Sequence, residues 1–92
     1  MDKELKAKWV SALRGGKYRQ ARGVLRRDKR TFCCIGVGVM VLDEKFDFQS
    51  QATMEASMAL GLDCAEKETL VDMNDYQSAT FAEIADYIES NL

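Results

Sequence analysis

The sequence predicts a small α+β domain that is mostly helical, with a short antiparallel sheet of two or three strands. Near both ends of the chain, apolar residues recur at helical spacing beside recognisable start or stop signals for helices. Between these segments, residues 23–33 are expected to form a short hairpin. The length of 92 residues suits one hydrophobic core, so residues 1–92 are expected to form a single domain.

Helices are expected at both ends of the chain. Residues 2–14 carry apolar side chains at every fourth position, and a glycine pair then ends the pattern. Residues 80–91 begin with a capping box, in which Thr80 accepts a hydrogen bond from a free amide and Glu83 reaches back. Both helices are expected to pack over residues 33–42. The apolar positions are Leu5, Trp9 and Leu13 in the first helix, and Phe81, Ile84, Ala85, Ile88 and Leu92 in the second.

A third helix is expected at residues 50–60. Ser50 is a suitable N-cap, and Met54 and Met58 stand four residues apart, which predicts that both side chains face the core. The sequence Leu60-Gly61-Leu62 is typical of a helix that ends at a glycine, with the following apolar residue folded back.

Two segments fit more than one structure. Residues 33–42 alternate apolar side chains like a strand, yet the same apolar run suits a buried helix. Gly36 and Gly38 within it lack the rest of a dinucleotide-binding fingerprint, so they are expected to permit close packing. Residues 67–73 fit a short strand or a turn of helix. Asn74-Asp75 is then expected to form a turn that closes the fold, the alternative being a polar contact to a ligand.

Charge is divided unevenly along the chain, although the formal net charge is only −2. Residues 1–30 sum to +8 and residues 31–92 sum to −10. Such asymmetry between two parts of a chain is informative about binding partners. The basic side chains are densest between residues 17 and 30, where Asp28 is the only acidic residue.

This basic stretch is the candidate binding site. Arginine matches the geometry of phosphate groups, and Tyr18 could stack on a base. Other interpretations stay open: the arginines could lie on a solvated face, pair with the acidic half within the chain or across a dimer, or dock on an acidic partner protein. The candidate ligand-binding residues are Lys17, Tyr18, Arg22, Arg26, Arg27 and Arg30.

The residues that usually perform catalysis or bind metals are scarce. The chain has no histidine, which is the commonest general base and metal ligand, and its three cysteines are too few for a tetrahedral zinc site. Cys33 and Cys34 lie between apolar neighbours and are expected in the core. We therefore predict no catalytic residue, no metal and no cofactor. An enzyme acting through Cys33 or Cys34 remains an alternative.

The longest apolar run, residues 32–42, is too short to span a bilayer, which requires about 20 apolar residues. No apolar stretch follows Met1, so we expect no secretory signal and no membrane association. An odd number of cysteines, two of them adjacent, fits a reducing cytoplasm.

The chain resembles a family of small uncharacterised bacteriophage and prophage proteins. The resemblance rests on four sets of residues. They are Trp9-Val10-x-Ala12-Leu13-Arg14-x-Gly16-Lys17-Tyr18-x-Gln20, then Gly23-x-Leu25-Arg26, then Phe32-Cys33-Cys34-Ile35-Gly36-Val37, and finally Asn74-Asp75 with Phe81-x-Glu83-Ile84-Ala85-Asp86-x-Ile88-Glu89. The resemblance favours a helix at residues 33–42. It implies a phage accessory protein made in the host cytoplasm.

From the residues and this resemblance together, we expect a non-enzymatic binding protein that acts in host takeover or counter-defence. Its basic stretch would bind a nucleotide, another phosphate-bearing ligand or nucleic acid. The alternative is an interaction module that inhibits a host enzyme, with the acidic half as a polyanion mimic. Association into a homo-oligomer is left open.

Overall fold

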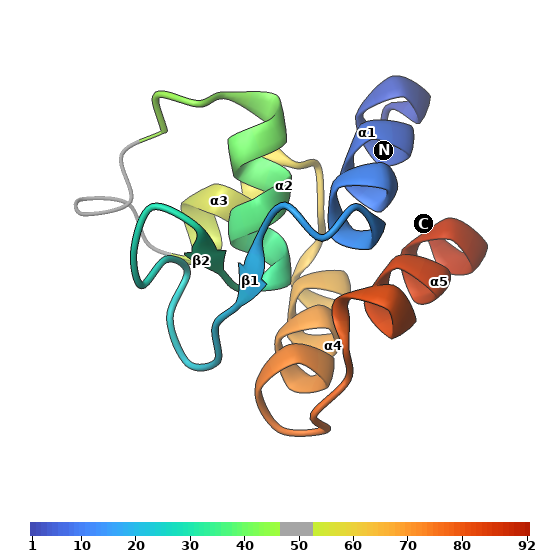
Figure 1. Ribbon diagram of the computed structural model, residues 1–92. Coiled ribbons are helices and arrows are strands. Elements are labelled where there is room, and N and C mark those ends of the chain that lie inside the picture. Colours follow the sequence, from blue (N-terminus) through green and yellow to red (C-terminus); the bar gives the residue numbers. More distant parts are fainter. Residues whose placement is uncertain (47–52) are drawn as a thin grey trace.

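Helix α2 (Cys34–Leu42) lies at the centre of the molecule, with the other elements around it (Figure 1). All six residues from Cys34 to Val39 are buried. Because every face of this part of the helix is covered, its apolar run carries no helical period, which explains why the sequence alone fitted both a strand and a helix. The computed structural model describes residues 1–46 and 53–92.

The described residues form five helices and a two-stranded sheet, which confirms the small, mostly helical domain predicted from the sequence. The remaining elements are α1 (Lys3–Arg14), β1 (Arg19–Gln20), β2 (Thr31–Phe32), α3 (Thr53–Ala59), α4 (Cys64–Asp75) and α5 (Phe81–Asn91). As predicted, α1 packs against α2. Helix α5 packs chiefly along α1 and also contacts α4, rather than lying mainly over α2 (Figure 1).

Both terminal helices have the predicted limits to within a residue or two. Asp2 is the N-cap of α1, where its carboxylate accepts a hydrogen bond from the amide of Leu5 at 2.9 Å. The capping box of α5 is confirmed, with Thr80 accepting from the amide of Glu83 and Glu83 accepting from the amide of Thr80. These short-range signals act within one turn of helix, which is why sequence reads them well.

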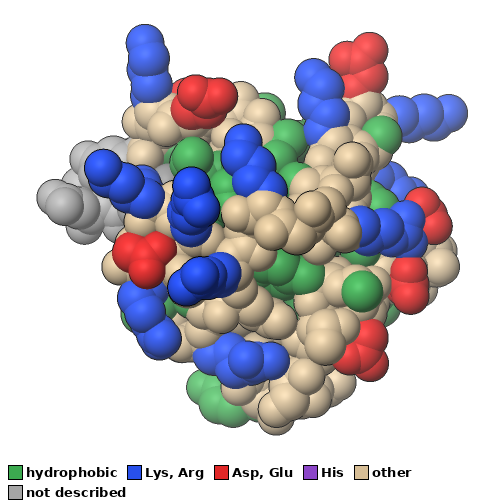
Figure 2. All heavy atoms as spheres, viewed as in Figure 1, with side chains coloured by type: hydrophobic (Ala, Val, Ile, Leu, Met, Phe, Trp, Pro, Cys, Tyr) green, Lys and Arg blue, Asp and Glu red, His purple; other side chains and the backbone are tan. Residues whose placement is uncertain are grey.

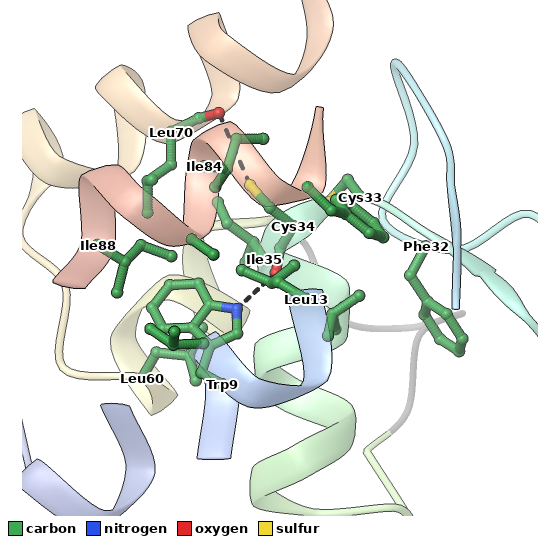
Figure 3. Packing of buried hydrophobic residues seen from close by; sticks show 14 of the residues in the cluster. Trp9, Leu13, Phe32, Cys33, Cys34, Ile35, Leu60, Leu70, Ile84 and Ile88 are labelled. Carbon is green, nitrogen blue, oxygen red and sulfur yellow. Dashed lines mark hydrogen bonds between the residues drawn. The ribbon is translucent and has the colours of Figure 1, made fainter. Parts of the chain in front are cut away.

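Trp9 joins α1 to α2. Its indole nitrogen donates a 2.9 Å hydrogen bond to the carbonyl of Cys34, and the ring is fully buried (Figure 3). Gly38 makes room for the ring, since a Cβ atom there would lie 2.9 Å from Trp9 and 2.8 Å from Leu60. At Gly36 a Cβ atom would lie 2.3 Å from the carbonyl oxygen of Leu25. The packing role predicted for both glycines is confirmed.

The predicted antiparallel sheet is wrong in orientation. Strands β1 and β2 pair in parallel, with Arg19 opposite Thr31 and Gln20 opposite Phe32. The expected hairpin partner of β2 is reduced to one antiparallel bridge between Arg26 and Phe32. Strand β2 therefore has β1 on one edge and residues 25–27 on the other. A two-residue strand carries no periodicity, so nothing in the sequence pointed to β1.

The predicted orientation of helix α3 (Thr53–Ala59) is wrong. Met54 and Met58 do not face the core, being 46% and 68% exposed, because α3 turns Ala56 and Ser57 inward instead. The predicted N-cap Ser50 lies outside the described residues.

Residues 67–73 belong to a longer helix, α4, which Asp63 begins with a capping box. The glycine stop after α3 is confirmed, with Gly61 at a φ of 79°.

Candidate phosphate-binding surface

Residues 17–30, named here the basic loop, connect helix α1 to strand β2 and include strand β1. Lys and Arg side chains gather over this part of the molecule, with little acidic side chain among them (Figure 2). The exposed basic residues of the loop are Lys17, Arg19, Arg22, Arg27, Lys29 and Arg30.

Part of the loop surrounds a hollow of about 520 Å³. Lys17, Tyr18 and Arg30, three of the predicted site residues, line it together with Lys29, Gly16 and Met40. Glu44 contributes one carboxylate to the same lining. A shallower depression of about 380 Å³ joins Lys29 and Arg30 to Arg19 and Asp28. Arg19 and Lys29 were not among the predicted site residues; the signal available was their place in the same basic stretch.

Arg22 and Arg27 lie close to each other but line neither hollow. The guanidinium of Arg27 donates a 3.5 Å hydrogen bond to the carbonyl of Arg22, and both side chains are exposed. Arg26 differs from them, because its guanidinium carbon lies 5.1 Å from the centre of the Phe32 ring and its Nε donates to the carbonyl of Asp28. Arg26 is thus partly used in building the loop, so it is a weaker candidate for ligand contact.

The aromatic ring of Tyr18 is also engaged within the protein. It meets the ring of Phe32 edge-on, with centroids 5.3 Å apart and planes at 89°. The ammonium of Lys17 lies 5.4 Å from the Tyr18 ring centroid. These contacts leave Tyr18 half-buried.

The six exposed loop cations form no ion pair with an acidic side chain in the described part of the chain. Among the described residues, the ion pairs join Arg14 to Asp86 at 2.6 Å and to Glu89 at 3.1 Å, linking α1 to α5. Hydrogen bonding to Arg14 lowers the pKa of Glu89. The one acidic residue of the loop, Asp28, accepts a 2.9 Å hydrogen bond from the amide of Arg30, and this bond chiefly lowers its pKa.

Asn74 holds the loop to the rest of the fold through all four of its hydrogen-bonding positions. Its amide oxygen accepts from the Cys34 amide at 3.2 Å and from the Gln20 side chain at 3.0 Å. Its nitrogen donates to the carbonyl of Ala21 at 2.8 Å and to the carboxylate of Asp75 at 2.7 Å. The residue is 1% exposed. The turn predicted at Asn74-Asp75 is wrong, because both residues belong to the last turn of α4, but their side chains do join the loop to that helix.

Asp75 also holds the basic loop to α4, because its carboxylate accepts a 3.0 Å hydrogen bond from the amide of Gly23. Arg22 therefore lies between two backbone groups fixed to α4, the carbonyl of Ala21 and the amide of Gly23. Gly23 has a φ of 82°, a conformation that side-chain-bearing residues rarely adopt. This geometry presents the Arg22 side chain to solvent from a fixed backbone.

The predicted burial of the adjacent cysteines is confirmed. Cys33 and Cys34 are buried, and Cys64 is exposed. Burial raises the pKa of Cys33 to about 11 and raises that of Cys34 well above its usual value. Reactive cysteines need a lowered pKa, because the thiolate is the nucleophile, so these two thiols are poor nucleophiles. Cys33 instead caps α2, where its sulfur accepts from the amide of Gly36.

Within residues 1–46 and 53–92, no group of three His, Cys, Asp or Glu side chains is placed to hold a metal ion. Over the same described residues, each helix is too short or too polar to cross a bilayer.

One family matches more than half of the chain. A domain of unknown function, DUF8296, covers residues 1–54. The chain belongs to this family. No curated protein and no solved structure matches the chain.

The DUF8296 match includes α1, the basic loop and α2. Helices α4 and α5 lie beyond it. The candidate surface thus lies inside the family domain, while the side chains of Asn74 and Asp75 that fix it come from outside the match.

Proposed function

We propose that the basic loop binds the phosphate groups of a ligand, and that the protein acts by binding rather than by catalysis. The observation that supports this most directly is the set of six exposed loop cations that form no ion pair among the described residues. Keeping like charges close together costs free energy unless an anion offsets it. The buried thiols, with raised pKa values, give no support to an enzyme acting through Cys33 or Cys34.

The biological setting we propose is that of a bacteriophage accessory protein in the host cytoplasm, acting in host takeover or counter-defence. The support for this setting is the sequence resemblance described above. The resemblance carries no known ligand, so the ligand class must be argued from the surface itself.

Binding is tested with fluorescently labelled duplex DNA, labelled single-stranded DNA and a labelled nucleoside triphosphate at low salt. The variant Arg22→Ala/Arg27→Ala removes two exposed loop charges. Its matched control, Lys3→Ala/Lys8→Ala, removes two exposed charges from α1. We expect the loop variant to bind at least one probe about 50-fold more weakly at about 0.1 M salt, as the loss of two phosphate contacts predicts. The control should bind like the wild type. If no probe binds at low salt, the proposal is wrong.

A second function is supported by the exposed surface of α4. Glu68 and Asp72 lie one turn apart there and line a depression of about 520 Å³ with Tyr76, which is 79% exposed. An acidic face with an exposed aromatic residue suits an interaction module that inhibits a host enzyme as a polyanion mimic. Capture of a host enzyme by the wild type, but not by Glu68→Gln/Asp72→Asn, would support it. Equal capture by both proteins would exclude this face.

A further inference from the structure

We infer that the ligand of the basic loop is a nucleic-acid duplex, contacted through the phosphates of its backbone and without sequence preference. This inference rests on the proposed function and names the ligand class for the same surface. Four properties of the loop lead to it: the state of its aromatic ring, the spread of its charges, the engagement of its only amide side chain and the fixed conformation of its backbone.

The loop offers no stacking platform for an unpaired base. Proteins that bind single strands stack successive bases on exposed aromatic side chains. Tyr18 is the only aromatic residue between residues 17 and 30, and it is half-buried, with Phe32 against it and the Lys17 ammonium near its ring. Phe32 itself is fully buried. The stacking role predicted for Tyr18 from sequence is therefore not proposed here.

The charges extend over more of the surface than one hollow. Lys17, Lys29 and Arg30 line the larger hollow, Lys29 and Arg30 also line the depression beside it together with Arg19, and Arg22 and Arg27 line neither. A mononucleotide carries its phosphates next to one another, so it would contact the cations of one hollow and leave the others without a phosphate. In the larger hollow its phosphates would also meet the carboxylate of Glu44. A duplex presents rows of phosphates along two strands, which suits cations distributed over a surface.

The loop also lacks a free amide to read base edges. Asparagine and glutamine recognise adenine by paired hydrogen bonds. Gln20 is the only such residue between residues 17 and 30, and its amide nitrogen already donates to Asn74 and to the carbonyl of Ala79 at 2.7 Å. Contacts to phosphates position a protein on a duplex but carry no sequence information.

The backbone that carries these charges is fixed before any ligand arrives. The hydrogen bonds from Asn74 to Ala21 and from Gly23 to Asp75 hold the residues on either side of Arg22. The amide of Arg30 is likewise bonded to Asp28. A preformed surface loses less conformational entropy on binding, which favours contact with a regular, stiff polymer.

The test is fluorescence anisotropy with a short labelled DNA duplex, a duplex of scrambled sequence, an RNA duplex of the first sequence, and the labelled single strand. Unlabelled ATP serves as competitor. We expect duplex DNA to bind at least about tenfold more tightly than the single strand, and the two DNA sequences to bind equally. The RNA arm shows whether the loop accepts both kinds of duplex backbone. With five or six phosphate contacts, affinity should fall about 10³-fold between about 50 and 200 mM salt.

The variant Arg22→Ala/Arg27→Ala should lower the slope of log K against log salt by about two, whereas the control Lys3→Ala/Lys8→Ala should keep the slope of the wild type. Tighter binding of the single strand, displacement of the duplex by millimolar ATP, or a clear preference between the two DNA sequences would overturn the duplex inference and leave the proposed function standing. Absence of binding by every probe would overturn both. Because the replaced side chains are exposed, the urea midpoints of the variants should match that of the wild type, which confirms that all are folded.

Discussion

Replacing Asn74 by alanine is expected to be the most damaging single polar substitution in this fold. Four partners lose their hydrogen bond to the side chain, and two of them, the amide of Cys34 and the carbonyl of Ala21, belong to fully buried residues. Each buried group left without a partner costs about 1–3 kcal/mol. The partners Gln20 and Asp75 are half-buried and can be hydrated instead, so they add less.

The expected loss is therefore about 2–6 kcal/mol. A domain of this length has a free energy of unfolding of about 5–14 kcal/mol, so Asn74→Ala removes a large part of it. Urea unfolding followed by circular dichroism measures the change, and the midpoint should fall by at least about 1 M.

A graded series of variants makes this prediction specific. Asp75→Ala removes only the partner of the exposed Gly23 amide and of Asn74, so it should cost about 1 kcal/mol. Asn91→Ala removes an exposed amide that donates to the carbonyl of Tyr87, and should change stability by less than about 0.5 kcal/mol. If Asn74→Ala unfolds at the same urea concentration as Asn91→Ala, the reasoning about buried partners is refuted.

Two further predictions concern reactivity and pH. Alkylation of the native protein should modify Cys64 alone, because the other two thiols are buried and their pKa values are raised; mass spectrometry should find three modified cysteines only after unfolding. Arg14 lowers the pKa of Glu89 in the folded protein below its pKa in the unfolded chain. The ionised carboxylate therefore stabilises the fold at pH values above its unfolded pKa, and this stabilisation is lost as the pH falls through its folded pKa. Glu89→Gln should therefore lower the urea midpoint at neutral pH but not in strong acid, and an equal difference at both pH values would contradict this.

The parts of the fold that sequence predicted well depend on local rules. The capping box at Thr80 and the apolar face of residues 2–14 involve neighbours within one or two turns of helix. The central helix was undecided from its residues alone, since an apolar run contains no period once every face is buried. The two methionines of α3 were placed wrongly because their spacing identifies one face of a helix but not which face turns inward.

The candidate site was predicted in composition but not in arrangement. The sequence identified the basic stretch, and the structure shows which of its cations are exposed. It also placed Arg26 and Tyr18 against Phe32, contacts between residues that no spacing rule relates. The polar contacts of Asn74 join residues 40 to 54 positions apart, and such pairings depend on the whole topology.

The long reach of these Asn74 contacts has a consequence for the order of folding. The bonds of Asn74 to Gln20 and Ala21, and the neighbouring bond from the Gly23 amide to Asp75, each close a stretch of more than fifty residues, which is entropically costly before the helices have come together. The basic loop should consequently be among the last segments to acquire its native hydrogen bonds. During synthesis residues 17–30 are made before Asn74, so the loop cannot form these bonds until α4 has been made. In refolding experiments, amide protection at Gly23 should appear after protection within α1 and α2.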